Sequence, residues 1–451
     1  MNTISSQVRI ACRLLGATAI LLAVAWLVTL ALGKAGGSRM PTVPADTELL
    51  ARGAYVEKLA DCGACHTAPG GREFAGGLPI PTPIGKIYSS NITPDQATGI
   101  GRYTLDDFER AVRRGIRPDG TSLYPAMPFP SYARISTPDL QALYVYFTRS
   151  VAPISQLDRA ADIPWPLSLR WPLTYWRWLF APRVKDGPDT AGDPYARGAY
   201  IVEGLGHCGS CHTPRGLWLQ EKALTAADGP AYLSGAVVDH YVAANLRGDP
   251  LTGLGSFTED DIVRLLQTGR TSSTAVFGGM TDVVSRSTQY MSQQDLHAVA
   301  RYLKTLPGGG EESPFSYDSF VGNQLAAGRV QARGARDYLN NCAACHLFSG
   351  RGYQDMFPAL AGNPITNGRD PSSLISIVLR GASIPATERT PTAFTMPPFA
   401  GTLTDEQVAD VVTFIRTSWG NHAPAVSPPQ VQDLRRAIGA SFGGPDLPRG
   451  R

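Results

Sequence analysis

The sequence predicts an all-α protein in which a repeated unit forms three tandem domains. A short segment with the pattern Ala-Arg-Gly-Ala recurs three times, and each repeat closes with a stretch whose apolar residues fall at the helical spacing i, i+3, i+4 and i+7. No period-two pattern typical of a strand is present. The 451 residues suffice for about two to four domains, and the 47 glycines and 36 prolines indicate that these are rich in loops.

An apolar run without charged residues extends from Leu14 to Leu32, behind two arginines. Its nineteen residues approach the roughly 20 that a helix needs to cross a bilayer, so we expect one N-terminal transmembrane helix. The basic flank predicts a cytoplasmic N-terminus and export of the rest of the chain. The alternative is a cleaved signal peptide, with Ala31 and Gly33 as small residues at the cleavage site.

The motif Cys-x-x-Cys-His occurs three times and is the attachment site of c-type haem. Both thiols form thioether bonds to the haem and the His binds the iron, so the motif must lie on a helical turn. A thioredoxin-like redox pair or half a zinc site would not explain the His after every pair. The seventh cysteine, Cys12, is expected to be inert. We therefore expect three covalently bound haem c groups, each with one iron, at Cys62, Cys65 and His66, at Cys208, Cys211 and His212, and at Cys342, Cys345 and His346.

The repeats set the expected domain boundaries. Each Arg of the repeated segment, at Arg52, Arg197 and Arg333, precedes its haem motif by about three turns of helix, and the Gly that follows it should let another helix approach closely. We expect an N-terminal anchor or signal over 1–40, domain 1 over 41–150, a Trp/Pro-rich linker over 151–192, domain 2 over 193–307, a linker over 308–330, domain 3 over 331–421 and a tail over 422–451.

Each domain should close with a helix that buries one apolar face. The first of these helices follows Ser136-Thr137-Pro138-Asp139, a typical start signal. The three apolar faces consist of Leu140, Leu143, Tyr144 and Phe147, of Leu296, Val299, Ala300 and Leu303, and of Val408, Val411, Val412 and Ile415.

A six-coordinate haem needs a second axial ligand, and a Met ligand opposite His raises the haem potential. Met127 is the only methionine left in the first domain, and Met396 has a similar setting in the third. Prolines flank both and favour an extended strap across the haem face. Met356 lies only ten residues after His346, in the loop expected on the His side, and is discounted.

The second domain offers two methionines. Met291 directly precedes the closing helix and so matches Ile135 and Leu403, positions where an apolar residue packs on the helix start. Met280 lies twelve residues ahead of that helix start, near the nine of Met127 and the eight of Met396. We therefore choose Met280 as the ligand.

Charge and aromatic residues bear on the partners. With 41 basic and 38 acidic residues, no electrostatic footprint points to nucleic acid. Four of the seven tryptophans lie in the linker over 151–192. They suit either a membrane or protein interface, or packing between haem domains.

The chain resembles the triple-haem cytochrome c subunit of bacterial membrane-bound dehydrogenases over about residues 45–420. The resemblance is carried by Phe74-Ala75-Gly76-Gly77, Ser90-Asn91-Ile92-Thr93-Pro94, Tyr124-Pro125-Ala126-Met127-Pro128 and Gly204-Leu205-Gly206-His207-Cys208. It implies that the repeats are class I cytochrome c domains. Together with the apolar run, this predicts three tandem class I cytochrome c domains preceded by one N-terminal transmembrane helix. It also implies that the iron ligands are His66, His212, His346, Met127, Met280 and Met396.

The resemblance further implies a non-catalytic role at the periplasmic face of the bacterial inner membrane. A catalytic dehydrogenase subunit, whether quinoprotein, flavoprotein or molybdenum hydroxylase, would pass electrons through the haems to ubiquinone or another respiratory acceptor. Two other functions compete with this one. In the first, the chain is an independent membrane-tethered electron shuttle. In the second, it is a haem enzyme such as a peroxidase, which needs an open iron face.

Overall fold

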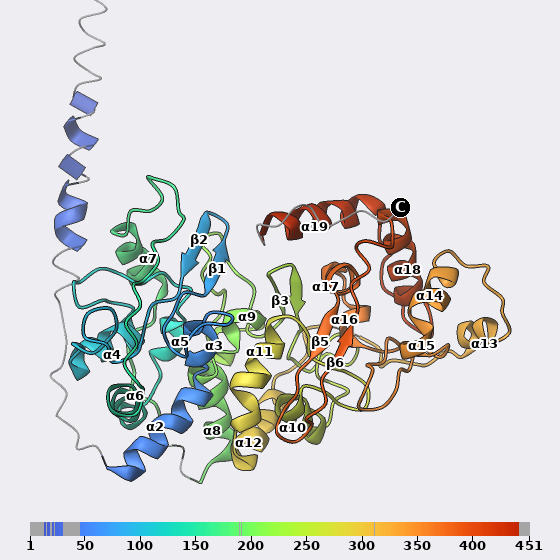
Figure 1. The fold of residues 1–451 in the computed structure, drawn as a ribbon, viewed down its shortest axis with the longest axis horizontal. Helices are drawn as coiled ribbons and strands as arrows, with labels where there is room; N and C mark the ends of the chain where they lie inside the picture. The colour runs from blue at the N-terminus through green and yellow to red at the C-terminus, as the bar shows by residue number, and fades with distance from the viewer. Residues whose placement is uncertain are drawn as a thin grey trace, which may run out of the picture. The chain divides into compact units, whose positions relative to one another are not determined.

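The computed structural model forms two compact units, shown as a ribbon in Figure 1. The first comprises Met1–Gly53 and Ala75–Asp186, and the second comprises Ala54–Phe74 and Gly187–Arg451. Helix α2 (Thr47–Leu59) runs from the first into the second. The structure describes residues 13–14, 16–18, 20–21, 23–29, 46–188, 190, 192–310 and 312–441.

The first unit begins with the described N-terminal positions and the start of α2. Its further elements are β1 (Pro79–Thr82), β2 (Gly85–Tyr88), α4 (Leu105–Arg114), α5 (Phe129–Tyr132), α6 (Thr137–Arg149) and α7 (Pro172–Phe180). Helix α6 begins as expected, with the Ser136 side chain accepting a hydrogen bond from the Asp139 N–H. Helix α7 lies in the expected linker, where Trp176 packs edge-on against Phe129 with ring centroids 6.1 Å apart. This part of the linker therefore packs within the first unit.

The predicted N-terminal transmembrane helix is wrong. Of the run from Leu14 to Leu32, the described positions are helical, and the longest described stretch covers residues 23–29. A span needs roughly 20 consecutive residues. Among the described residues, none of the helices combines the length and the apolar character needed to cross a bilayer. The expectations for Cys12, Ala31 and Gly33 lie outside the described residues.

The second unit holds all three haem-attachment motifs. It contains the end of α2, α3 (Cys62–His66), α8 (Pro194–Tyr200), the π-helix η1 (Ile201–Leu205), α9 (Gly209–His212), the 3-10 helix η2 (Ala226–Asp228), β3 (Ala236–Val238), β4 (Tyr241–Ala243), α10 (Glu259–Thr268), α11 (Gly279–Arg286), the 3-10 helix η3 (Thr288–Tyr290) and α12 (Gln293–Lys304). It continues with α13 (Phe320–Ala326), α14 (Ala335–Asn341), α15 (Ala343–His346), α16 (Pro364–Asn367), α17 (Ser372–Arg380), β5 (Ala382–Ile384), β6 (Phe394–Met396), α18 (Asp405–Thr417) and α19 (Pro428–Ser441).

The all-α expectation also needs correction, because the structure contains β-hairpins. Strands β1 and β2, β3 and β4, and β5 and β6 pair as antiparallel two-stranded sheets. Each strand is only three or four residues long, too short to display a period-two pattern. Strand β1 reads Pro-Ile-Pro-Thr, and prolines normally argue against a strand.

The closing helices of the three repeats are confirmed as α6, α12 and α18, and Leu140, Leu296 and Val408 on them are fully buried. A repeated contact ties each closing helix to the helix that precedes the haem motif. Arg52 pairs with Asp139 at 2.7 Å in the first repeat. Arg197 pairs with Asp295 at 2.8 Å in the second, through two nitrogens. The third repeat replaces the ion pair by a hydrogen bond, in which the Gln407 amide donates to Asp337 at 3.2 Å.

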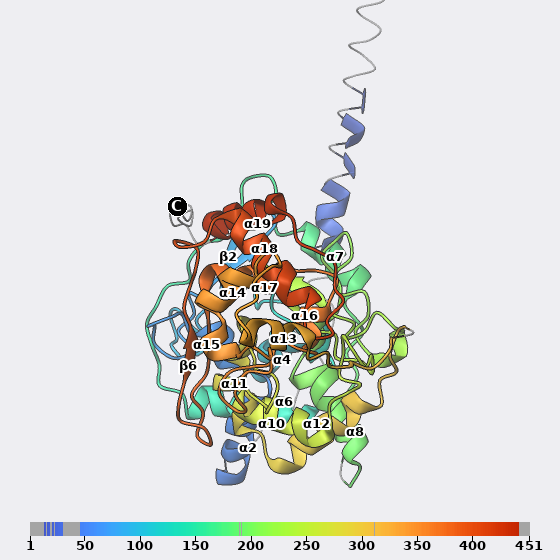
Figure 2. The same cartoon turned by 90° about the vertical axis from the view of Figure 1, so that its right-hand side faces the viewer.

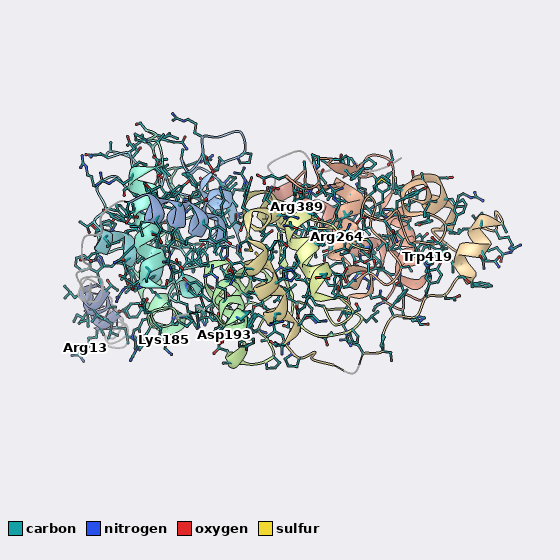
Figure 3. All side chains as sticks on the ribbon, turned by 90° about the horizontal axis from the view of Figure 1, so that it is seen from below. Arg13, Lys185, Asp193, Arg264, Arg389 and Trp419 are labelled. Atoms are coloured by element: carbon teal, nitrogen blue, oxygen red, sulfur yellow. The ribbon has the colours of Figure 1, made fainter. Side chains whose placement is uncertain are left out.

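Residues outside the expected third domain complete its core. Helix α19, in the expected tail, packs on α17 and α18 (Figures 1 and 2), and buries Val431 and Ile438. Leu325 of α13, from the expected linker, joins the same hydrophobic cluster. They join residues of the expected domain itself, such as Trp419 (labelled in Figure 3), which is 1% exposed in the same cluster. The composition of the expected linker and tail did not indicate that α13 and α19 belong to this core.

Candidate haem sites

Each of the three Cys-x-x-Cys-His motifs lies on a single turn of helix, as haem attachment requires. The first motif forms the whole of α3. In the second, the His212 N–H donates to the Cys208 carbonyl at 3.0 Å, and in the third the His346 N–H donates to the Cys342 carbonyl at 2.9 Å. These i→i+4 bonds bring the first thiol and the imidazole of each motif onto one face.

Two of the motif histidines have their ring orientation fixed by a backbone carbonyl. Nδ1 of His212 lies 2.7 Å from the Ala244 oxygen, and Nδ1 of His346 lies 2.9 Å from the Pro358 oxygen. A carbonyl only accepts, so Nδ1 carries the proton and Nε2 keeps a lone pair for a metal. Burial lowers the pKa of both imidazoles, which favours this neutral form.

Three of the motif cysteines have a pKa shifted in the direction opposite to that of a redox-active thiol. All six are free in the structure. Burial is the main cause that raises the pKa of Cys65, Cys208 and Cys342, each to about 12. A thioredoxin-like nucleophile needs a lowered pKa instead. Within the described part of the chain, no three His, Cys, Asp or Glu side chains gather into a group that would hold a metal ion.

Buried polar atoms near the second motif fit a large group that is attached there. The Tyr232 hydroxyl and the Arg247 Nε are buried and have no hydrogen-bond partner among the described residues. Burial and, next, the nearby Cys208 thiol raise the pKa of Tyr232. Unpaired buried donors are costly. A haem with propionate oxygens is a group that would satisfy them.

The expected methionine ligands lie in three different local structures. Met127, in the first unit, occupies a turn in which its N–H donates to the Tyr124 carbonyl at 3.2 Å, so the segment is not fully extended. Met280 is the second residue of α11. Met396 ends β6 and pairs with Ala382, where a proline-flanked loop was expected. Met291 is buried directly before α12, in agreement with its expected packing role.

The first attachment turn lies against the second repeat within the second unit. Helix α3 contacts α11, which carries Met280. Burial raises the pKa of Cys65, and the charges of Asp61 and of the Cys211 thiol raise it further. The Tyr55 hydroxyl on α2, seven residues before α3, donates to Asp295 of α12 at 2.6 Å. The sequence reasoning missed this link.

A buried acid also went unnoticed at the start of α3. Asp61 is 7% exposed, has a left-handed φ of 52°, and its Oδ1 has no hydrogen-bond partner among the described residues. Burial, with the carboxylates of Glu57 and Asp282, raises its pKa to about 8. The sequence does show an acid directly before the first Cys-x-x-Cys-His motif. A single Asp in a sequence, however, gives no indication that its side chain is buried.

Known proteins are similar in sequence to this chain over most of its length. A profile of the cytochrome c family matches residues 331–419. The cytochrome c subunit of the quinone alcohol dehydrogenase of Gluconacetobacter polyoxogenes is 52% identical over 407 residues, which cover 89% of this chain and 87% of that one.

Two further relatives extend the comparison. The gluconate 2-dehydrogenase cytochrome c subunit of Pantoea cypripedii is 50% identical over 417 residues, covering 91% of this chain and 95% of that protein. The fructose dehydrogenase cytochrome subunit of Gluconobacter japonicus is 35% identical over 408 residues, covering 86% and 82%. Together with the three attachment turns, this similarity shows that the chain belongs to the family of cytochrome c subunits that transfer electrons, without catalysing the substrate reaction, in bacterial dehydrogenase complexes.

Proposed function

We propose that the chain carries three haem c groups, in domains over 41–150, 193–307 and 331–421, and passes electrons from a catalytic dehydrogenase subunit to ubiquinone or another respiratory acceptor. The catalytic partner is a quinoprotein, a flavoprotein or a molybdenum hydroxylase. The complex works at the periplasmic face of the bacterial inner membrane, since haem c is attached outside the cytoplasm. Bound haem iron cycles between the ferric and ferrous states and so carries one electron at a time.

The geometry of the attachment turns carries this proposal. Three such turns, on α3, α9 and α15, offer two thiols and an imidazole each. The carbonyls that accept from Nδ1 of His212 and His346 leave Nε2 available to the iron. Met127, Met280 and Met396 are the proposed second protein ligands of the three haems. Held by a histidine and a methionine each, the haems would carry electrons without leaving a site for substrate.

The haem content and the partner are tested together on the native complex. We expect the mature cytochrome chain to show a mass with three haem additions and a pyridine haemochrome spectrum of the c type. We also expect it to co-purify with a large dehydrogenase subunit whose substrate reduces the haems. Fewer than three additions would contradict the haem assignment. If the chain purifies without a partner and still transfers electrons to the respiratory acceptor, the independent shuttle is favoured.

The choice of Met280 over Met291 gives a second prediction. Met280→Ala is expected to convert the second haem from low spin to high spin and to let the reduced protein bind carbon monoxide at one haem per chain, because the iron loses a ligand. Met291→Ala, the matched control, removes a buried packing residue and is expected to leave the absorption spectrum unchanged. Spectra of the reduced variants, with and without carbon monoxide, measure both effects.

The same experiment addresses the enzyme alternative. A peroxidase keeps one iron face open, so the unaltered protein would bind carbon monoxide strongly. If it does, one of the three methionines is not a ligand. If Met291→Ala rather than Met280→Ala opens the second haem, our assignment for that domain is reversed.

A further inference from the structure

The segment that leads to Met396 has a second set of anchors outside its own repeat. It forms the hairpin of β5 and β6, in which Ala382 pairs with Met396. The connecting residues 385–393 and the ends of the hairpin form what we call the Met396 strap, residues 382–396. Within the third repeat, Phe394 packs edge-on against Phe357 with ring centroids 5.6 Å apart. Two strands of three residues each give little stability by themselves.

Arg270, which follows α10 in the second repeat, holds this strap through its guanidinium. Its Nη2 donates to the Thr392 carbonyl at 2.6 Å and to the Thr390 carbonyl at 3.4 Å. Its Nη1 donates to the Asp355 carbonyl at 3.2 Å, beside Phe357. The guanidinium carbon also lies 5.2 Å from the centroid of the Phe394 ring, two residues before Met396.

The position of Arg270 makes these contacts effective. The residue is only 4% exposed, so its hydrogen bonds to carbonyls are shielded from water. The planar fork of donors reaches several oxygens at once, which no other side chain does with the same rigidity. Burying a guanidinium is costly. An apolar residue would fill the space at lower cost, which indicates that Arg270 serves to fix the strap.

Two weaker contacts connect the same elements. The Thr281 hydroxyl, adjacent to Met280 on α11, donates to the Ser383 carbonyl of β5 at 3.2 Å. The Gln289 side-chain oxygen accepts from the Glu388 N–H at 3.1 Å. The second repeat thus contacts the strap at its beginning, its middle and its end.

We propose that Arg270 is the positioning residue of the third haem site: from the second repeat, it holds residues 390–394 so that Met396 stays on the iron. The inference rests on the proposed function, because it takes Met396 as the ligand. It makes the ligand set of the third haem depend on a neighbouring domain, so the docked second repeat is part of the third site.

The test uses the full chain with three variants. Arg270→Met fills the volume but removes the donors, and Met396→Ala provides the reference for a third haem without its ligand. Arg264→Gln is the matched control, because Arg264 (labelled in Figure 3) pairs with Asp355 at 2.7 Å across the same two repeats but at a half-exposed position. The measurements are carbon monoxide binding per chain, the methionine-to-iron charge-transfer band and the midpoint potentials of the three haems.

We expect Arg270→Met to bind carbon monoxide at one haem per chain, with the difference spectrum of Met396→Ala and a lowered potential of that same haem. Arg264→Gln should resemble the unaltered protein. Arg270→Lys keeps the charge but concentrates it in one ammonium group, so it should bind carbon monoxide at an intermediate fraction of chains. This variant also decides the question if Arg270→Met does not fold.

Two results would overturn the role of Arg270. Only the second would also overturn the assignment of Met396 as the ligand. If Met396→Ala opens the third haem but Arg270→Met and Arg270→Lys leave it closed, Arg270 does not position the strap and Met396 remains the ligand. If Met396→Ala leaves all haems closed to carbon monoxide, Met396 is not the ligand, and both the ligand assignment and the role of Arg270 fall.

Discussion

Replacing both Cys208 and Cys211 by serine is expected to stop electron flow through the complex. Without the thioethers, the proposed ligands His212 and Met280 alone are not expected to retain the haem through maturation, so the chain should carry two of the three proposed haems. Reduction of the acceptor by the substrate should then fall to the rate measured without the cytochrome subunit. Mass spectrometry of the chain and steady-state quinone reduction by the complex measure the two effects.

The second haem is expected to matter most because of where its segment lies. Tyr55, just before the first attachment turn, donates to Asp295 of the second repeat. On the other side, the Ser376 hydroxyl of α17 donates to the His240 carbonyl at 2.8 Å. The second repeat thus contacts both the first attachment segment and the third repeat. We therefore expect the proposed second haem to lie between the other two, so that its removal interrupts electron flow.

Cys12→Ser is the control for this double substitution, since it also removes a thiol but lies outside the motifs. It should keep three haems and full electron flow. If the double variant keeps its electron flow with only two haems, the expectation that electron flow through the complex requires the second haem is refuted.

Local signals were sufficient to predict the haem turns and the long helices. Periodic apolar residues predicted α6, α12 and α18. The structure adds capping boxes at Thr104 and Thr258, each formed with an acid three residues later, which the sequence analysis did not predict. These features depend on residues close in the sequence. The spacing of a haem motif is likewise a property of one helical turn.

Features that depend on distant partners were not predictable from one sequence. The N-terminal run satisfied a hydropathy criterion, yet the described residues contain no helix that would span a membrane. Helix α19 looked like a polar tail, because its apolar residues are few. Arg435 of this helix is buried and forms an ion pair with Asp405 at 2.8 Å. It also donates hydrogen bonds to the carbonyls of Ala400 and Leu403. These contacts explain how so polar a helix packs on the core. The contacts of Arg270 with the Met396 strap also join residues that are far apart in the sequence.

The glycine of the repeated Ala-Arg-Gly-Ala segment was expected to allow close helix approach, and here sequence and structure agree. A Cβ added to Gly198 of α8 would overlap the Ala298 carbonyl of α12 and approach the Tyr302 Cβ to 2.8 Å. Gly53 meets the Ala142 carbonyl in the same way within the first unit. In the third repeat, Gly334 faces the Asp410 carbonyl and also has a φ of 76°.

Gly198→Ala is therefore expected to destabilise the second repeat. Alanine normally stabilises a helix interior by up to about 1 kcal/mol relative to glycine. Here the added methyl meets backbone that has to move, and overpacking of this kind costs about 1–3 kcal/mol. The movement would also lengthen the adjacent Arg197–Asp295 pair, now 2.8 Å. We expect the free energy of unfolding of this repeat to fall by about 2 kcal/mol, because the overpacking outweighs the gain in helix propensity.

Gly309→Ala is the matched control, because a Cβ there meets nothing within 4 Å. Thermal unfolding of the holoprotein, followed by circular dichroism and by the haem absorption, compares the two variants. The gain in helix propensity would raise the unfolding temperature, and the cost of overpacking would lower it. The direction in which the unfolding temperature shifts therefore shows which effect is larger. A Gly198→Ala protein that unfolds no earlier than Gly309→Ala would mean that α8 and α12 separate at little cost, and the glycine would then reflect common descent of the repeats rather than packing.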